Sequence, residues 1–189
     1  MPLKFAEPTD GAIPLSLIFS DQFEGWRDGL DAAARAWVDA SGFRGDPGAA
    51  LALPAADGSL RAAVGGLGAS AMPRRDPFLA ARIRAALPDG TYVLAASPSG
   101  EDLDEVALGW LLGGYAFSRY RDQKPPKAQL VAPDGVAVAR LVHIAAGEAL
   151  TRDLINTPSS DMATRMRRCE GLSPSRMSGS ARETMTDIE

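Results

Sequence analysis

The 189-residue chain is 46% hydrophobic, which is enough for one ordinary core and a tail but not for a second domain of useful size. Its formal net charge of -4 argues against a strongly basic nucleic-acid binder, so a nucleic-acid partner is not expected. Cys169 is the single cysteine, which excludes an internal disulfide framework and a zinc knuckle.

The first half of the chain alternates strand and helix patterns. The apolar run Leu15 to Phe19, closed by turn residues, predicts a buried strand. Helical spacing of apolar residues then predicts a helix that starts at about Phe23 or Leu30 and runs to Ala40, with Gly42 as its cap. Two apolar runs, 49–53 and 60–64, flank the turn signal Asp57-Gly58 and predict a hairpin.

The second half continues the alternation. A helix is predicted from Pro77 to Leu87 and a strand over residues 91–95. Ser99 is the predicted N-cap of the next helix, which has an acidic first turn and an apolar face formed by Leu103, Val106, Ala107, Trp110, Leu111, Gly114 and Phe117. A strand over residues 127–132 precedes a helix from Val136 to about Ile155. The first half of that helix is apolar nearly all round, so it is expected to be largely buried.

These elements predict an α/β fold in which a mixed sheet, parallel wherever helices cross over, is flanked by helices and includes one hairpin. One domain is expected over residues 1–162. It is followed by an irregular, disordered tail over residues 163–189, where Arg, Ser and Met show no apolar period. Residues 1–8 lack the basic start and apolar run of a signal peptide, and no segment approaches the roughly 20 apolar residues of a membrane span. A cytoplasmic location without membrane contact is therefore expected.

The segment Gly66-Leu67-Gly68-Ala69-Ser70-Ala71 formally matches a glycine-rich nucleotide fingerprint after a predicted strand. In such a fingerprint a helix begins inside the glycines, so that its N-terminus holds a pyrophosphate. Pro73 and Pro77 interrupt the segment that would form this helix. A plain glycine turn that lets the chain leave the strand is therefore favoured over phosphate binding.

Residues suited to catalysis or metal binding are few. His143 is the sole histidine, and with no HExxH motif, second imidazole or GxSxG elbow, a packed or partly exposed structural role is favoured. The acidic residues at the start of the predicted helix resemble a hard-metal site, but carboxylates in a first helical turn more commonly satisfy the helix N-terminus and face water. They are Glu101, Asp102, Asp104 and Glu105. No metal, cofactor-binding or catalytic residue is therefore predicted.

The aromatic and cationic residues also favour structural interpretations. Among Trp26, Trp37 and Trp110, the last two lie on apolar helix faces, so core packing is preferred to a stacking surface. Cys169 lies beside two arginines that would lower its pKa if held in place, but in a disordered tail it is an ordinary exposed thiol. The cations of the tail are Arg165, Arg167, Arg168, Arg176 and Arg182, and a solvated segment is preferred to weak nucleic-acid attraction.

Two segments carry a family resemblance that covers roughly residues 1–162. Residues 104–120, DEVALGWLLGGYAFSRY, are similar to the second-to-last helix of the N-terminal domain in the leucyl aminopeptidase (cytosol aminopeptidase) family. Residues 148–162, with the core TRDLINTP, resemble the junction between that family's two domains. The two motifs occur in the family's order and spacing.

The resemblance implies a two-domain metallo-aminopeptidase, usually a homohexamer, which removes N-terminal residues from peptides with two zinc or manganese ions. It also implies a macro-like N-terminal domain, with the metal ligands and the catalytic Lys and Arg in a C-terminal domain that carries an Asn-Thr-Asp-Ala-Glu-Gly-Arg signature. This signature is absent from the sequence. After Met162 the carboxylates are Glu170, Glu183, Asp187 and Glu189 on an unpatterned chain, too few for a two-metal cage.

The expected molecule is therefore a truncated or frameshifted aminopeptidase that holds the N-terminal, non-catalytic domain and no cofactor of its own. Two alternatives remain open. One is a free-standing macro-like module that binds a nucleotide or ADP-ribose at its glycine turn. The other is an interaction domain that joins aminopeptidase oligomers or binds DNA.

Overall fold

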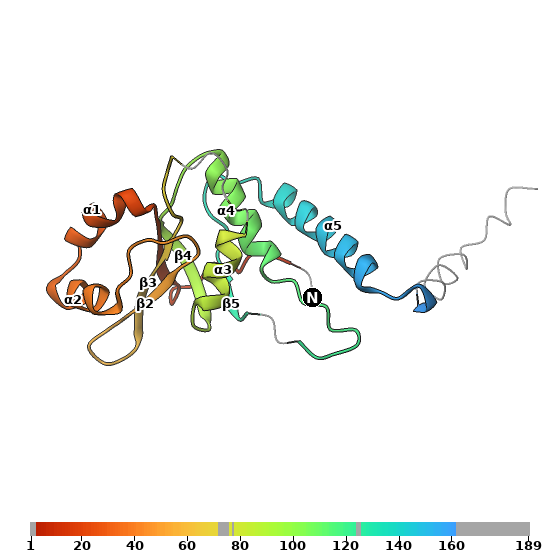
Figure 1. Ribbon diagram of the computed structural model, residues 1–189, viewed down its shortest axis with the longest axis horizontal. Helices are drawn as coiled ribbons and strands as arrows, with labels where there is room; N and C mark the ends of the chain where they lie inside the picture. Colours follow the sequence, from red (N-terminus) through yellow and green to blue (C-terminus); the bar gives the residue numbers. More distant parts are fainter. Residues whose placement is uncertain (1–2, 72–75, 77, 124–125, 162–189) are drawn as a thin grey trace, which may run out of the picture. The chain divides into compact units, whose positions relative to one another are not determined.

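The computed structural model describes residues 3–71, 76, 78–123 and 126–161. Within them, five strands form one sheet in the order β2-β3-β1-β4-β5 (Figure 1). The hairpin strands β2 and β3 are antiparallel, and the other neighbours are parallel. The strands are β1 (Ile13–Ile18), β2 (Ala50–Pro54), β3 (Leu60–Gly66), β4 (Gly90–Ala96) and β5 (Ala128–Leu130). The predicted hairpin and mixed sheet are confirmed.

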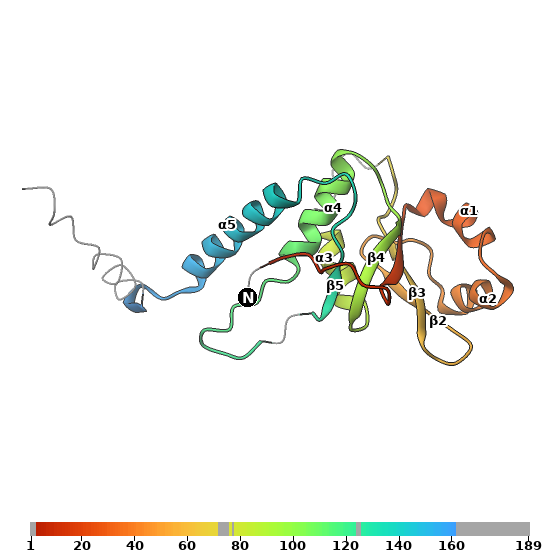
Figure 2. The same cartoon turned by 180° about the vertical axis from the view of Figure 1, so that it is seen from behind.

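Helices cover both sides of this sheet, as right-handed crossovers between parallel strands require. Figures 1 and 2 show α1 and α2 grouped on one side and α3 with α4 on the other. The helices are α1 (Phe23–Asp28), α2 (Ala32–Ser41), α3 (Leu79–Ala86), α4 (Glu101–Leu112) and α5 (Val138–Asn156). No described helix has the length and apolar character needed to cross a membrane.

Side-chain alternation along the strands divides the core into two clusters. Leu15 and Leu17 of β1 pack with residues of α3, α4 and α5. Ile18 packs on the other face with Phe23 of α1 and Val38 of α2. Because successive strand residues point to opposite faces, one short apolar run supplies both layers. The predicted fold class, a mixed sheet flanked by helices, is confirmed.

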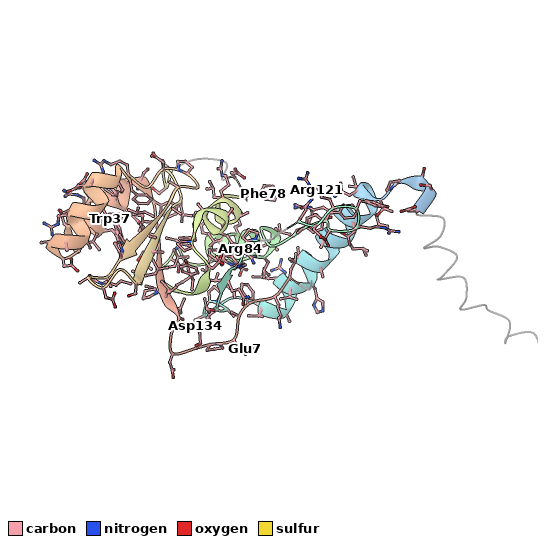
Figure 3. All side chains as sticks on the ribbon, turned by 90° about the horizontal axis from the view of Figure 1, so that it is seen from below. Glu7, Trp37, Phe78, Arg84, Arg121 and Asp134 are labelled. Atoms are coloured by element: carbon pink, nitrogen blue, oxygen red, sulfur yellow. The ribbon has the colours of Figure 1, made fainter. Side chains whose placement is uncertain are left out.

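The predicted helix from Phe23 or Leu30 to Ala40 is two helices. The chain turns at Gly29, and the Asp31 carboxylate accepts a hydrogen bond of 2.9 Å from the Ala34 amide to cap α2. Gly42 ends α2 in the left-handed region, as predicted. The core prediction for Trp37 is wrong, because its side chain is 47% exposed while the neighbouring Val38 is buried. Figure 3 shows Trp37 at the surface, where its indole N–H donates to the Ala52 carbonyl at 3.0 Å.

The two predicted ends of α4 are wrong. Gly100, with φ of 66°, is the N-cap instead of Ser99, and no described side chain caps the helix. The helix stops at Leu112, so Gly114 and Phe117 do not continue its apolar face. A Cβ at Gly113 would lie 2.8 Å from the Ala81 Cα. This close approach to α3 explains why glycine stands there.

The last helix, α5, begins two residues later than predicted and is not largely buried. Leu141 and Ala145 are its buried residues, whereas Val138, Ile144 and Leu150 are 39%, 42% and 53% exposed. Residues up to Thr151 belong to the first compact unit. Of the second unit, the structure describes the end of α5 and a turn in which the Thr157 hydroxyl donates to the Asp153 carbonyl. Pro77, Cys169 and the predicted disordered tail lie outside the described residues.

Candidate functional site

The carboxyl ends of β1, β3 and β4 meet at one edge of the sheet because these strands are parallel. Ligands of open α/β sheets bind in the crevice at this edge. The glycine segment that follows β3 and the acidic start of α4 both lie there. This edge is therefore the place to look for a binding or catalytic site.

The amides of the glycine segment are occupied within the fold. The Gly66 N–H donates to the Ala49 carbonyl at 2.8 Å, and the Leu67 N–H donates to the Ile18 carbonyl at 2.9 Å. The Gly68 N–H donates to the Gly45 carbonyl at 3.1 Å. Phosphate cradles rely on backbone amides that point at the ligand. These three amides point into the fold instead.

A carboxylate closes the end of the same segment. Asp21 accepts a hydrogen bond from the Ser70 hydroxyl at 2.6 Å and another from the Ser70 amide at 3.2 Å. Both hydrogen bonds lower the pKa of Asp21, and the bond from the Ser70 hydroxyl has the larger effect. A carboxylate held in its charged form repels a phosphate, and the next helix, α3, begins only at Leu79. The geometry is that of a structural turn.

The glycines at 66 and 68 allow close packing of their segment against a neighbouring loop. A Cβ at Gly66 would lie 2.6 Å from the Gly45 carbonyl oxygen. A Cβ at Gly68, whose φ is +75°, would lie 2.7 Å from the Pro47 Cγ. The segment after β3 and the loop over residues 45–48 thus approach each other more closely than any residue with a Cβ permits.

We therefore expect Gly66→Ala to lower the free energy of unfolding by about 1–3 kcal/mol, as overpacking does. The obstacle at Gly66 is backbone, which cannot swing away as a flexible side chain would. Urea denaturation followed by tryptophan fluorescence measures the effect. Gly11→Ala is the control, because a Cβ there meets no described atom within 4 Å. Equal stability of the two variants would contradict this account of the glycine turn.

A shallow pocket lies beside the turn. Its apolar wall includes Leu67, Leu79, Ala80, Pro98 and Val106, and its carboxylates are Asp76, Asp102 and Glu105. The Asp76 carboxylate accepts a hydrogen bond from the Phe78 amide at 2.9 Å and pairs with Arg82 at 3.0 Å, so it is already engaged next to the start of α3. Among the described residues, no three His, Cys, Asp or Glu side chains are placed to hold a metal ion.

The other predicted candidates are dispersed over the chain. His143 is exposed on α5. Trp26 packs against Phe23 and Phe43 with ring centroids 6.4 and 6.3 Å apart. Trp110 is 1% exposed, as core packing requires. Asp104 and Glu105 lie in the first turns of α4. The side chain of Glu101 and the arginines of the tail lie outside the described part of the chain.

Arg84 of α3 is a structurally central residue that the sequence pattern does not reveal. Its guanidinium donates to the Ala128 carbonyl at 2.9 Å and to the Trp110 carbonyl at 2.8 Å, and lies over the Trp110 ring at 5.9 Å. Burial lowers the pKa of Arg84. Figure 3 shows Arg84 within the domain, where it joins α3, the end of α4 and β5. The pair Gly113-Gly114 is the one sequence signal, since a Cβ at Gly114 would lie 2.5 Å from the guanidinium.

A comparison with protein-family models matches residues 13–133 to the N-terminal domain of M17 aminopeptidases. A search of curated protein sequences gives no significant match. Several solved structures resemble the chain. Cytosol aminopeptidase from Coxiella burnetii is 28% identical with a TM-score of 0.71, over 89% of this chain and 37% of that one.

The bottromycin maturation enzyme BotP, in complex with Mn, is 26% identical with a TM-score of 0.57, over 84% of this chain and 36% of its own. A mutant of tomato leucine aminopeptidase is 19% identical with a TM-score of 0.61, over 89% of this chain and 42% of its own. This last likeness concerns the fold alone. The chain spans well under half the length of these solved structures.

Proposed function

Since the chain belongs to the M17 aminopeptidase family through its N-terminal domain, we propose that it is the non-catalytic part of a leucyl aminopeptidase-like protein. The match of residues 13–133 to the N-terminal domain model is the observation that carries this proposal. We assign this domain to residues 1–162 and treat residues 163–189 as a tail without chemistry. The catalytic part corresponds to the portion of the relatives that this chain does not match.

The two divalent cations of the family do not fit the described residues. Two-metal hydrolysis needs several ligands converging on ions about 3.5–4 Å apart. Asp76, Asp102 and Glu105 line the same pocket, but Asp76 is engaged with Arg82 and with the Phe78 amide next to α3. No described group of His, Cys, Asp or Glu forms a metal site. We therefore derive no step of peptide hydrolysis from these residues.

The nucleotide-binding alternative is disfavoured by the glycine turn. Its amides donate to carbonyls of the fold, and Asp21 places a negative charge where a diphosphate would need a donor. The family acts on peptides through its catalytic part. Membership of this family is also the basis on which we propose that the chain forms a homo-oligomer in the cytoplasm. No described feature of the chain favours DNA over this assembly role.

Purified chain is expected not to hydrolyse leucine p-nitroanilide, even with added manganese or zinc. The physical reason is that no described residues form the metal site that would activate water. Release of p-nitroaniline is followed by absorbance, with cytosol aminopeptidase from Coxiella burnetii as the positive control. Turnover above a metal-only blank that is abolished by a chelator would refute the proposal.

A further inference from the structure

The sheet has two outer edges, and the chain covers one of them with its own backbone. Beyond β5, the Ala6 N–H donates to the Leu130 carbonyl at 2.7 Å, and Ala6 forms a parallel bridge with Val131. The other edge is β2, which pairs only with β3 in the described sheet. An uncovered edge offers its backbone groups to any extended strand that meets it. The edge of β2 is therefore the place where an added strand would pair.

The register of the hairpin shows which backbone groups β2 presents at this edge. The Gly66 N–H donates to the Ala49 carbonyl at 2.8 Å, so these two residues form a hydrogen-bonded pair. Such pairs alternate with non-hydrogen-bonded pairs along an antiparallel ladder. Ala50 and Ala52 occupy the non-hydrogen-bonded positions of this register. Their N–H and C=O groups therefore point away from β3.

Proteins commonly protect a free edge with a charged residue, a proline or a bulge. The last residue of β2 is Pro54, and the register shifts beside it, so this end of the edge is protected. Residues 50–53 carry neither a charge nor a proline. This part of β2 would therefore accept a second strand unless another segment covers it.

Trp37 of α2 lies against this part of the edge. Figures 1 and 2 show α2 beside the hairpin, and burial of the next residue, Val38, fixes the side of the helix that faces the core. The Trp37 indole N–H donates to the outward Ala52 carbonyl at 3.0 Å. An added strand would lie about 4.8 Å from β2, so the indole occupies the space that this strand needs.

We propose that Trp37 is an edge guard, which prevents β2 from pairing with β2 of a second copy of the chain. A second copy fits this edge because antiparallel pairing about a twofold axis places the same uncharged segment on both sides. The guard explains why a large aromatic side chain is 47% exposed on α2. It is separate from the homo-oligomer proposed above, so the assembly of the wild-type chain is the reference for its test.

The test is sedimentation velocity of the purified full chain over a range of concentrations, with the variants Trp37→Ala and Trp37→Met. Both variants lack the indole N–H and the wide ring, and both introduce good helix formers, so α2 should persist. Each is expected to self-associate at least about tenfold more tightly than the wild-type chain. Both variants also remove exposed apolar surface, which by itself would lower non-specific association.

Ala52→Pro locates the interface. Proline is tolerated at an edge position whose N–H faces away from the ladder, and it removes a donor that an added strand would use. Alone, Ala52→Pro should leave the unfolding temperature and the assembly of the wild-type chain unchanged. Combined with Trp37→Ala, it should return self-association to within about twofold of the wild-type level.

Tyr120→Ala is the matched control for the loss of an exposed aromatic side chain. Tyr120 is 53% exposed and lies outside the sheet, so its removal should not change self-association. A rise equal to that of the Trp37 variants would overturn the edge guard. Wild-type association in both Trp37 variants, or loss of folding in both by circular dichroism, would also overturn it.

The remaining outcomes concern the place of contact. Association of Trp37→Ala without association of Trp37→Met would assign the effect to lost packing and refute the proposal. Association that Ala52→Pro does not reverse would place the interface elsewhere on the chain. Unfolding of Ala52→Pro alone would show that the Ala52 N–H is needed inside the sheet, which is incompatible with an outward-facing edge.

Discussion

Replacing Trp110 with alanine is expected to lower the free energy of unfolding by about 3–5 kcal/mol, the range for truncating a buried aromatic. The Trp110 side chain is 1% exposed, and its ring lies 6.3 Å from that of Tyr92. The Arg84 guanidinium carbon lies over the Trp110 ring, 5.9 Å from its centroid. Loss of the indole would leave a cavity bordered by β4, α3 and α4. Urea denaturation monitored by far-ultraviolet circular dichroism measures the loss.

Trp110→Phe is the matched control for this prediction. The indole N–H of Trp110 makes no hydrogen bond to any described residue, so removing it leaves no orphaned partner. The phenyl ring retains most of the apolar volume. Trp110→Phe should therefore cost clearly less than Trp110→Ala. A loss below about 1 kcal/mol for the alanine variant would contradict the buried placement.

Replacing Arg84 with methionine is expected to lower the free energy of unfolding by about 2–4 kcal/mol, since hydrogen bonds from a charged donor are worth more than neutral ones. Methionine keeps the apolar stem but leaves the carbonyls of Ala128 and Trp110 without their donor. Those carbonyls belong to β5 and to the last turn of α4. The same urea denaturation measures the effect.

Two control variants test whether the hydrogen bonds of the Arg84 guanidinium cause the expected loss of stability. Arg84→Lys keeps the charge but lacks the fork that reaches both carbonyls at once, so it should recover a part of the lost stability. Arg82→Met removes an arginine from the same helix whose side chain is 53% exposed, and should change stability by less than about 0.5 kcal/mol. Equal losses for Arg82→Met and Arg84→Met would refute the special position of Arg84.

The order and type of most elements could be predicted from the sequence, because local periodicity and turn chemistry are properties of neighbouring residues. Leu15 and Leu17 in an apolar run predict a strand, Asp57-Gly58 predicts the hairpin turn, and the strand lies at Ile13–Ile18. The helix ends were less accessible. Gly100 replaces Ser99 as the cap of α4, and Gly113 ends that helix at the approach of α3. The end at Gly113 depends on Ala81, which is distant in the sequence.

The features of the candidate site also fall into those that the sequence reveals and those that only the tertiary structure reveals. The sequence by itself determined the family resemblance and the lack of the catalytic signature, because motifs are strings of adjacent residues. Only the tertiary structure decided that the amides of Gly66, Leu67 and Gly68 are occupied by carbonyls of other segments, and that Arg84 joins three elements. It also decided which side of α5 is covered. Periodicity reports that a helix is apolar, whereas its exposure depends on which other elements pack against it.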